Sequence, residues 1–244
     1  MKIIFVNHSC FLAELADTIL IFDFWRLPWQ KNRDFSPEEY LDKGKKLFVF
    51  ASHGHEDHYS PHIFDWDNGK RDVTYILSDD IAVPQLKTNR ISVGENREIV
   101  LDPIRVRTFG STDLGVSFWI RTEEASLFHA GDLNWWHWDE ETPDERKYAE
   151  DFFKGIMQNI VEYGKKEQIK PDVAFFPVDG RLEYAAFWAG EYFIRELSPK
   201  IFFPMHFWKK FSLTEAFADR EKTLNAGTNC IVIHHNIEEF NIQI

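Results

Sequence analysis

The densest group of chemically capable side chains in the sequence is the segment 52–58, Ser-His-Gly-His-Glu-Asp-His. It holds three imidazoles and two carboxylates, and it follows the apolar run Leu-Phe-Val-Phe at residues 47–50. A turn at the end of a buried strand needs only Gly, Asn or Asp, so these groups exceed what a turn requires. The segment is a candidate metal site, with a solvated surface turn as the alternative.

Three later segments also place ligand-type side chains after an apolar, strand-like run. His129 and Asp132 follow residues 126–128, Asp179 follows residues 173–176, and His206 follows residues 201–203. Imidazole and carboxylate are ligands that zinc and similar divalent ions bind. Because strand ends at one rim of a sheet can converge in space, these side chains are candidates to share a site with segment 52–58. The plain alternatives are a turn carboxylate and a core imidazole.

The spacing within segment 52–58 suits metal binding. Side chains two residues apart on extended chain point the same way, so His53 and His55 can reach one ion. Asp57 and His58 can serve a second ion after a turn, and Gly54 lets the backbone bend without a Cβ clash. Two adjacent ions can hold a bridging hydroxide and stabilise the oxyanion of a hydrolytic step.

The elements that must position these residues are strands in the first half of the chain and alternating helices and strands in the second. Apolar runs predict strands at residues 3–6, 18–24, 46–51, 74–77, 97–101, 104–109, 115–121, 126–129, 172–176, 200–203 and 229–234. Capping boxes predict helices beginning after Ser36 and Thr142, and apolar spacing predicts another over residues 182–197. This order predicts an α+β fold with two sheets face to face and helices outside, in a single domain spanning residues 1–244.

Bulk composition limits the function classes. A hydrophobic share of 44% and a charged share of 28% in 244 residues are typical of a globular protein. The net charge of −12 disfavours nucleic acid as a partner and leaves a small-molecule substrate as the expectation. Two cysteines form no disulfide framework, and no apolar stretch is long enough to span a membrane, so we expect a cytoplasmic protein. The substrate and the oligomeric state stay open.

Three motifs carry a resemblance to a known family. Residues 53–58, His-Gly-His-Glu-Asp-His, resemble the His-x-His-x-Asp-His signature of the metallo-β-lactamase superfamily. Residues 129–132, His-Ala-Gly-Asp, look like its later Gly-Asp motif, and residues 204–206, Pro-Met-His, look like its last His motif. The opening segments 7–11 and 19–23 are similar to those of the branch containing the ascorbate-6-phosphate lactonase-like and N-acyl-phosphatidylethanolamine phospholipase D-like hydrolases.

The resemblance implies roles for the matching residues. His53 and His55 would bind a first ion, Asp57, His58 and His206 a second ion, and Asp132 would bridge both. It implies a four-layer αβ/βα sandwich and a metal-dependent hydrolase, in which a metal-bound hydroxide attacks an ester, lactone, amide or phosphodiester. Asp57 or Asp132 would also accept a proton. Zinc is the expected metal, one or two ions per chain, with manganese, iron and nickel as alternatives.

One ligand of the family pattern is absent. The family has another His between its first motif and its Gly-Asp motif, whereas residues 108–113 here read Thr-Phe-Gly-Ser-Thr-Asp. Asp113 or Ser111 is a candidate oxygen ligand in its place, and the carboxylate is the stronger of the two. His129 or His137 is a candidate to approach from nearby; otherwise the site holds a single ion. The two histidines are explained equally well without metal binding. His129 would then be an orienting or core side chain, and His137 part of an aromatic cluster.

Four further residues resemble positions near the active site of that branch. Asp179 is a candidate orienting or substrate-contacting residue, and Arg181 is a candidate partner for an anionic substrate group or for a loop salt bridge. His8 and Asp23 lie near the site in the resembled proteins, and we expect Asp23 to hold a loop.

Two alternative functions stay open. A nuclease of the same superfamily is opposed by the net charge of −12. A metal-binding protein without turnover is favoured by the absent His and opposed by the completeness of the other ligands.

Overall fold

The computed structural model describes residues 1–25, 40, 43–67, 71–82, 89–224 and 227–244. The chain divides into two compact units, residues 1–93 with 235–244 (unit 1) and residues 94–234 (unit 2), which are described separately below. The single domain expected over residues 1–244 stays a prediction, and the helix predicted after Ser36 falls outside the described residues. No helix in the described part of the chain is long and apolar enough to cross a membrane.

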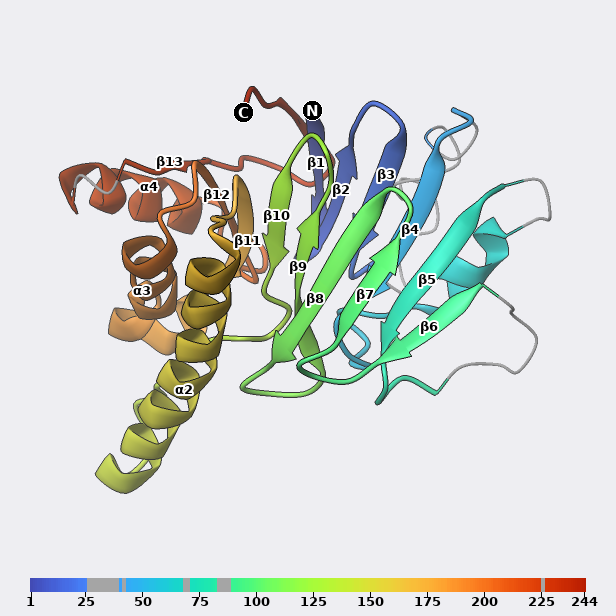
Figure 1. Cartoon of the computed structure of the whole chain (residues 1–244). Helices are drawn as coiled ribbons and strands as arrows, with labels where there is room; N and C mark the ends of the chain where they lie inside the picture. The colour runs from blue at the N-terminus through green and yellow to red at the C-terminus, as the bar shows by residue number, and fades with distance from the viewer. Residues whose placement is uncertain (26–39, 41–42, 68–70, 83–88, 225–226) are drawn as a thin grey trace. The chain divides into compact units, whose positions relative to one another are not determined.

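Unit 1 is built on a seven-stranded sheet in the order β14-β1-β2-β3-β4-β5-β6 (Figure 1). Its strands are β1 (Lys2–Asn7), β2 (Cys10–Glu14), β3 (Thr18–Phe22), β4 (Lys46–Ala51), β5 (Val73–Ser78), β6 (Arg90–Val93) and β14 (Glu238–Asn241). The pairs from β14 to β3 are antiparallel, and those from β3 to β6 are parallel. Strands β3 and β4 are buried along nearly their whole length, which explains their continuous apolar sequences.

Unit 2 contains a second seven-stranded sheet, in the order β13-β12-β11-β10-β9-β8-β7. Its strands are β7 (Glu98–Leu101), β8 (Ile104–Gly110), β9 (Val116–Arg121), β10 (Ser126–His129), β11 (Val173–Pro177), β12 (Ile201–Met205) and β13 (Asn229–Cys230). The pairs from β7 to β10 are antiparallel, and those from β10 to β13 are parallel. The helices are α2 (Pro143–Glu167), α3 (Trp188–Leu197) and α4 (Ser212–Leu224), with short 3₁₀ helices η1 (Pro61–Trp66) in unit 1 and η2 (Gly180–Ala185) in unit 2.

A local capping signal marks the start of α2 in unit 2. The capping box predicted at Thr142 is present: its hydroxyl accepts from the Glu145 N–H, and its own N–H donates to the Glu145 carboxylate. The helix predicted over residues 182–197 is interrupted, because Glu183 adopts a φ of 50° that no α-helix contains. Most apolar residues of this segment are buried, but the chain forms η2 and then α3.

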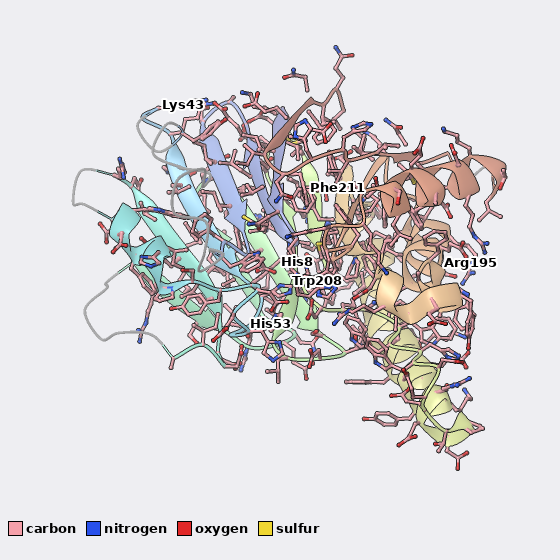
Figure 2. The ribbon with its side chains drawn as sticks, turned by 180° about the vertical axis from the view of Figure 1, so that it is seen from behind. His8, Lys43, His53, Arg195, Trp208 and Phe211 are labelled. Carbon is pink, nitrogen blue, oxygen red and sulfur yellow. The ribbon has the colours of Figure 1, made fainter. Side chains whose placement is uncertain are left out.

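Aromatic rings attach α3 to the sheet of unit 2. The ring of Phe193 on α3 lies 4.6 Å from that of Phe176 and 5.0 Å from that of Phe128, measured between centroids. All three side chains are fully buried. Arg195, on another face of the same helix, points outward (Figure 2). The helix is thus held by one apolar face over the strands that carry the candidate residues.

The candidate residues lie just beyond strand ends in both units. In unit 2, β10, β11 and β12 run parallel, and Asp132, Asp179 and His206 each follow the carboxyl end of one of them. In unit 1, β3 and β4 end side by side, where the Asp23 N–H donates to the Phe50 carbonyl at 2.9 Å. Because carboxyl ends of parallel strands share one edge of a sheet, each unit gathers its polar side chains at one rim.

Candidate metal centre

The loop after β4 presents the first group of imidazoles. His53 is fully buried and His55 is exposed, and His53 Nε2 lies 2.9 Å from His55 Nδ1. The two rings meet edge to face, at a centroid distance of 4.6 Å and an interplanar angle of 81°. The prediction that residues 53 and 55 point the same way is therefore correct, and their nitrogens are close enough to bind one ion.

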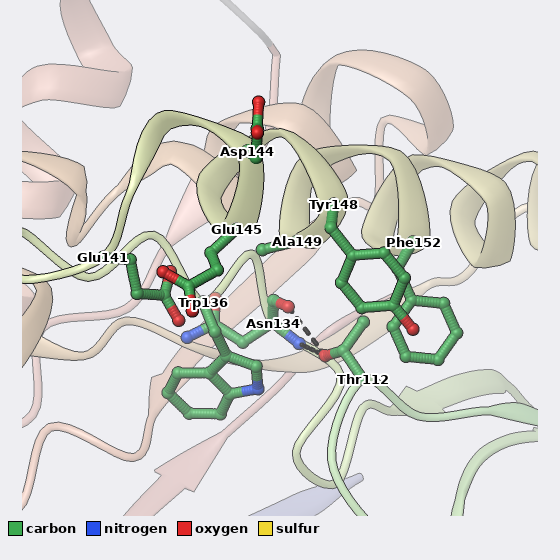
Figure 3. A pocket seen from close by; sticks show the side chains of 9 residues that line it. All are labelled: Thr112, Asn134, Trp136, Glu141, Asp144, Glu145, Tyr148, Ala149 and Phe152. Carbon is green, nitrogen blue, oxygen red and sulfur yellow. Dashed lines mark hydrogen bonds between the residues drawn. The ribbon is translucent and has the colours of Figure 1, made fainter.

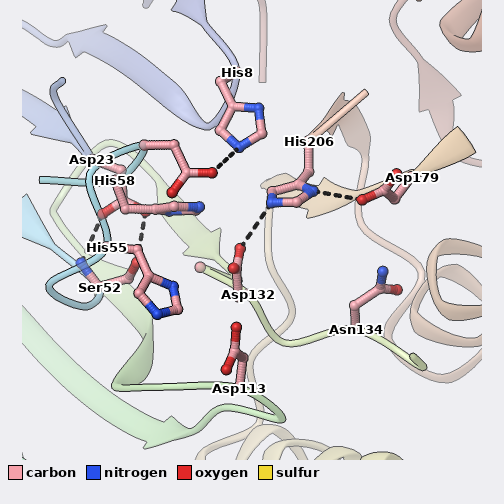
Figure 4. Close-up of polar contacts among 12 residues, drawn as sticks. His8, Asp23, Ser52, His55, His58, Asp113, Asp132, Asn134, Asp179 and His206 are labelled. Carbon is pink, nitrogen blue, oxygen red and sulfur yellow. Dashed lines mark hydrogen bonds and ion pairs between the residues drawn. The ribbon is translucent and has the colours of Figure 1, made fainter. Parts of the chain in front are cut away.

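Asp23 organises this loop from the end of β3. One carboxylate oxygen accepts the Ser52 N–H at 2.7 Å, and the other accepts the Ser52 hydroxyl at 2.7 Å and pairs with His58 Nδ1 at 2.8 Å (Figure 4). Ser52 Oγ also lies 3.0 Å from His53 Nδ1. Because Ser52 gives its proton to Asp23, it accepts from His53, which leaves Nε2 of His53 and of His58 as the lone-pair nitrogens.

Asp57 and His8 stand beside His58. His8 Nε2 lies 3.3 Å from Asp57 Oδ2, and one ligand atom from each of His8, Asp57 and His58 lies within 4.8 Å of the other two. Burial alone would raise the pKa of Asp57, but the His8 and His58 imidazoles lower it well below its ordinary value. Unit 1 therefore holds a compact set of two imidazoles and one carboxylate.

Unit 2 contributes Asp132 and His206. His206 Nε2 lies 3.3 Å from Asp132 Oδ1, and His206 Nδ1 lies 2.9 Å from Asp179 Oδ2 (Figure 4). Arg181 donates to the same Asp179 carboxylate through Nε at 2.9 Å. Burial acts to raise the pKa of Asp179, but the bonds from His206 and Arg181 lower it to about 2. Asp179 thus stays ionised and fixes the proton of His206 on Nδ1.

The four residues considered as replacements for the absent His lie in unit 2. Ser111 Oγ accepts the Asp113 N–H at 3.3 Å, and the Asp113 side chain points toward Asp132 (Figure 4). His129 is buried, and its Nδ1 accepts the Gly131 N–H at 3.2 Å. His137 Nε2 lies 3.0 Å from the Tyr184 hydroxyl. Of the four side chains, that of Asp113 points toward the candidate ligand Asp132 (Figure 4).

His137 belongs to an aromatic cluster rather than to the group around Asp132. Its ring centroid lies 4.7 Å from that of Trp188 and 5.8 Å from that of Tyr184. Burial first, and then the Arg146 charge, lower its pKa. This placement matches the alternative stated for it, packing among aromatic rings.

Backbone conformation marks three residues of these groups. His8, Asp23 and His206 have φ values of 45°, 46° and 63°, in the left-handed region that non-glycine residues seldom adopt. Such strain is retained where the surrounding structure requires one side-chain direction. Sequence reasoning placed no ligand role on His8 and gave Asp23 only a loop-holding role, because no sequence signal reports a positive φ at residues other than glycine.

Comparisons with known proteins identify relatives of the fold. No family model matches the sequence. A curated relative, a UPF0173 metal-dependent hydrolase from Caldivirga maquilingensis, is 23% identical over 83% of this chain and 80% of its own length. Igni18, a metallo hydrolase from Ignicoccus hospitalis, superposes with a TM-score of 0.66 at 18% identity over 99% of both chains. The metallo-β-lactamase fold protein YhfI from Bacillus subtilis superposes with a TM-score of 0.59 at 12% identity, over 99% of this chain and 100% of its own.

Proposed function

Because this chain has the metallo-β-lactamase fold, we propose that it is a metal-dependent hydrolase. The fold class predicted from the sequence, α+β with two mixed sheets and helices, is confirmed. The enzyme class expected from the motifs agrees with the descriptions of the curated relative and of Igni18. The finer resemblance to the lactonase-like and phospholipase D-like branch stays a prediction.

The observation that carries the proposal is a pair of buried carboxylate–histidine contacts. His58 is held by Asp23 in unit 1, and His206 is held by Asp179 in unit 2, each through Nδ1. Metal-binding histidines nearly always bond an oxygen through the second ring nitrogen in this way. All four side chains, those of the two histidines and the two aspartates, are buried. A core histidine without a ligand role does not need a buried carboxylate on its second ring nitrogen.

The proposed ligands follow the sequence motifs. We assign His53, His55 and Asp132 to a first ion, and Asp57, His58, His206 and Asp132 to a second, with Asp132 bridging. His8 joins the second set on the strength of its 3.3 Å contact with Asp57. Two atoms bound to one tetrahedral zinc ion are roughly 3.3 Å apart. The same 3.3 Å separates His206 Nε2 from Asp132 Oδ1, so the donors in each unit have the spacing of a ligand set.

Zinc is the metal that the proposed ligands favour, because they are imidazole nitrogens and carboxylate oxygens, and the proposed set includes no cysteine. When bound, a divalent ion supplies a Lewis acid and makes water acidic enough to act as a nucleophile near neutral pH. Manganese, iron or nickel would serve the same ligands. Asp57 and Asp132 are the proposed proton acceptors. The lowered pKa of Asp57 keeps its carboxylate ionised, the form that binds a metal ion.

Asp113 is the proposed replacement for the absent histidine. It lies in unit 2 with Asp132, and its carboxylate points toward that residue (Figure 4). A carboxylate is a strong ligand for zinc, whereas the Ser111 hydroxyl is a weak one. The substitution Asp113→Ala is expected to reduce metal content from two ions toward one, whereas Ser111→Ala leaves it unchanged.

The net charge and the two cysteines bear on the substrate class and on the location of the protein. We propose a small-molecule ester, lactone, amide or phosphodiester as substrate, because the net charge of −12 opposes nucleic acid. Cys10 and Cys230 are both free, which supports the proposed cytoplasmic location.

The test combines metal content with turnover. Protein purified without a His tag is expected to hold about two zinc ions by elemental analysis and to hydrolyse members of a panel of esters, lactones and phosphodiesters. His55→Ala and Asp132→Ala should abolish hydrolysis and lower the zinc content, whereas His235→Ala, at an exposed residue, should leave both unchanged. A protein that binds metal but turns over no panel member supports the alternative of a non-catalytic metal-binding protein. A protein that takes up neither zinc nor manganese contradicts the proposal.

A further inference from the structure

A pocket in unit 2 lies beside the residues of that unit's ligand group. It has a volume of about 430 Å³ and lies between the loop after β10 and the first turns of α2 (Figure 3). Its lining residues are Thr112, Asn134, Trp136, Glu141, Asp144, Glu145, Tyr148, Ala149 and Phe152. The volume falls in the range of small-molecule sites.

Two contacts connect this pocket, called the α2 pocket below, to Asp132 and His206. Thr112 Oγ1 lies 3.2 Å from the Asp132 carbonyl and 2.7 Å from the Asn134 carbonyl, and it accepts the Asn134 N–H at 2.8 Å. The Trp136 ring lies 5.8 Å from the His206 ring. The backbone that presents Asp132 therefore also forms the pocket wall.

The charge and the surface of the α2 pocket favour a cation. Three of its lining residues are carboxylates, Glu141, Asp144 and Glu145, and none is Lys, Arg or His. Three others are aromatic: Trp136, Tyr148 and Phe152. Aromatic faces and carboxylates together attract ammonium groups. The amino end of α2 would by itself attract an anion, but the Glu145 carboxylate already bonds Thr142 there.

Three of the lining residues carry buried polar atoms without partners. Among the described residues, Asn134 Nδ2, Trp136 Nε1 and Glu141 Oε2 are buried and have no hydrogen-bond partner. Asn134 is 1% exposed, and its Oδ1 accepts the Trp135 N–H at 2.9 Å, which fixes its Nδ2 as the remaining donor. Unpaired buried donors and acceptors are costly. Two donors and one acceptor around one pocket suit a ligand that carries both an oxygen acceptor and a positive charge.

We propose that the α2 pocket binds an organic ammonium group that has an oxygen acceptor a few bonds away, as in an amino-alcohol ester. Glu141 faces the charged nitrogen, Asn134 Nδ2 and Trp136 Nε1 donate to the oxygen, and the aromatic rings cover the apolar part. That this ligand is the substrate rests on the proposed hydrolase function. The ligand class rests on the pocket alone.

Binding tests the ligand class without requiring turnover. Acetylcholine is titrated into the protein by calorimetry and by Trp fluorescence, beside its uncharged carbon analogue, in which a tert-butyl group replaces the trimethylammonium. We expect acetylcholine to bind at least about tenfold more tightly than the uncharged analogue, because one cation–π or charge contact strengthens binding by about that factor. Glu141→Gln, which keeps the side-chain shape, should remove most of that preference. Glu162→Gln, at an exposed position on the same helix, should leave it unchanged.

The outcomes separate the pocket from the hydrolase. Equal binding of the cation and its analogue, or a preference that survives Glu141→Gln, overturns the ligand class even if esters are hydrolysed. Selective cation binding by a protein that hydrolyses no choline ester contradicts the substrate role, and the ligand class proposed for the α2 pocket is retained. If no lactone, amide or phosphodiester is hydrolysed either, the proposed function is contradicted as well. Selective binding together with faster hydrolysis of choline esters than of their tert-butyl analogues supports both.

Discussion

His8 Nε2 and Asp57 Oδ2 lie 3.3 Å apart, although one residue is in the turn after β1 and the other is in the loop after β4. His8 is buried and has a φ of 45°, so the backbone is held in a costly conformation that aims the ring at Asp57. An imidazole that only paired with a carboxylate could be placed by ordinary backbone. The contact is the basis on which His8 is proposed as a further ligand of the second ion.

His8→Ala is expected to weaken binding of one ion at least tenfold, because it removes a nitrogen donor beside Asp57 and His58. The affinity is measured by zinc competition with a chelator. The matched control is His62→Ala, because the His62 ring is exposed and pairs with the surface carboxylate of Asp65. Unchanged zinc affinity in His8→Ala would remove it from the ligand set and leave it as an orienting residue at most.

Asp179→Asn should weaken metal binding and slow hydrolysis by about 10–100-fold, the usual effect of removing the carboxylate behind a metal-bound histidine. The amide keeps the shape of the side chain but loses the negative charge that orients His206 and binds Arg181. Zinc competition and steady-state kinetics are the measurements. The control Asp219→Asn alters an exposed carboxylate on α4 and is expected to change neither, so a similar loss in both variants would count against a special role for Asp179.

The sequence predicted the candidate ligands that follow strands and gave no ligand role to His8, which lies in a turn. Segment 53–58, Asp132 and His206 were identifiable because apolar runs end directly before them. The loop-holding role expected of Asp23 is confirmed by its bonds to Ser52 and His58. A role for His8 could not be assigned, because its placement depends on a positive φ and on which strands pair. The break at Glu183 was missed for the same reason: apolar spacing continued across it while the backbone did not.

Glu221 should make stability depend on pH. Burial, and then the Glu191 carboxylate, raise its pKa from 4.5 to about 7. A raised carboxyl pKa means that the folded state prefers the protonated form, so this group costs no stability below about pH 4.5, and its cost grows as the pH rises to about 7. Glu221→Gln is therefore expected to raise the free energy of unfolding by about 2 kcal/mol near pH 8 and to change little near pH 4.5.

Urea unfolding at the two pH values measures this difference. Glu215→Gln, on the exposed face of the same helix, serves as the control and should show no such dependence. A Glu221→Gln variant equally stabilised at both pH values would indicate that the gain comes from packing and not from the charge.

Two glycines in helices should respond in opposite directions to alanine. A Cβ at Gly190 in α3 would lie 2.9 Å from Phe217 Cζ and 3.2 Å from Phe202 Cζ, whereas a Cβ at Gly155 in α2 meets nothing within 4 Å. Gly190→Ala must displace rings packed between α3, α4 and β12, so we expect it to lower the free energy of unfolding by about 1–3 kcal/mol. Gly155→Ala gains helix propensity at no steric cost and should raise it by about 0.5–1 kcal/mol. Urea unfolding measures both free energies, which are compared when the two variants have the same m-value. Each variant is the control for the other, because both add one methyl group to a helical glycine. A gain at Gly190 would mean that α3 can move away from the sheet, and that the aromatic contacts of Phe193 do not hold it as firmly as their burial indicates.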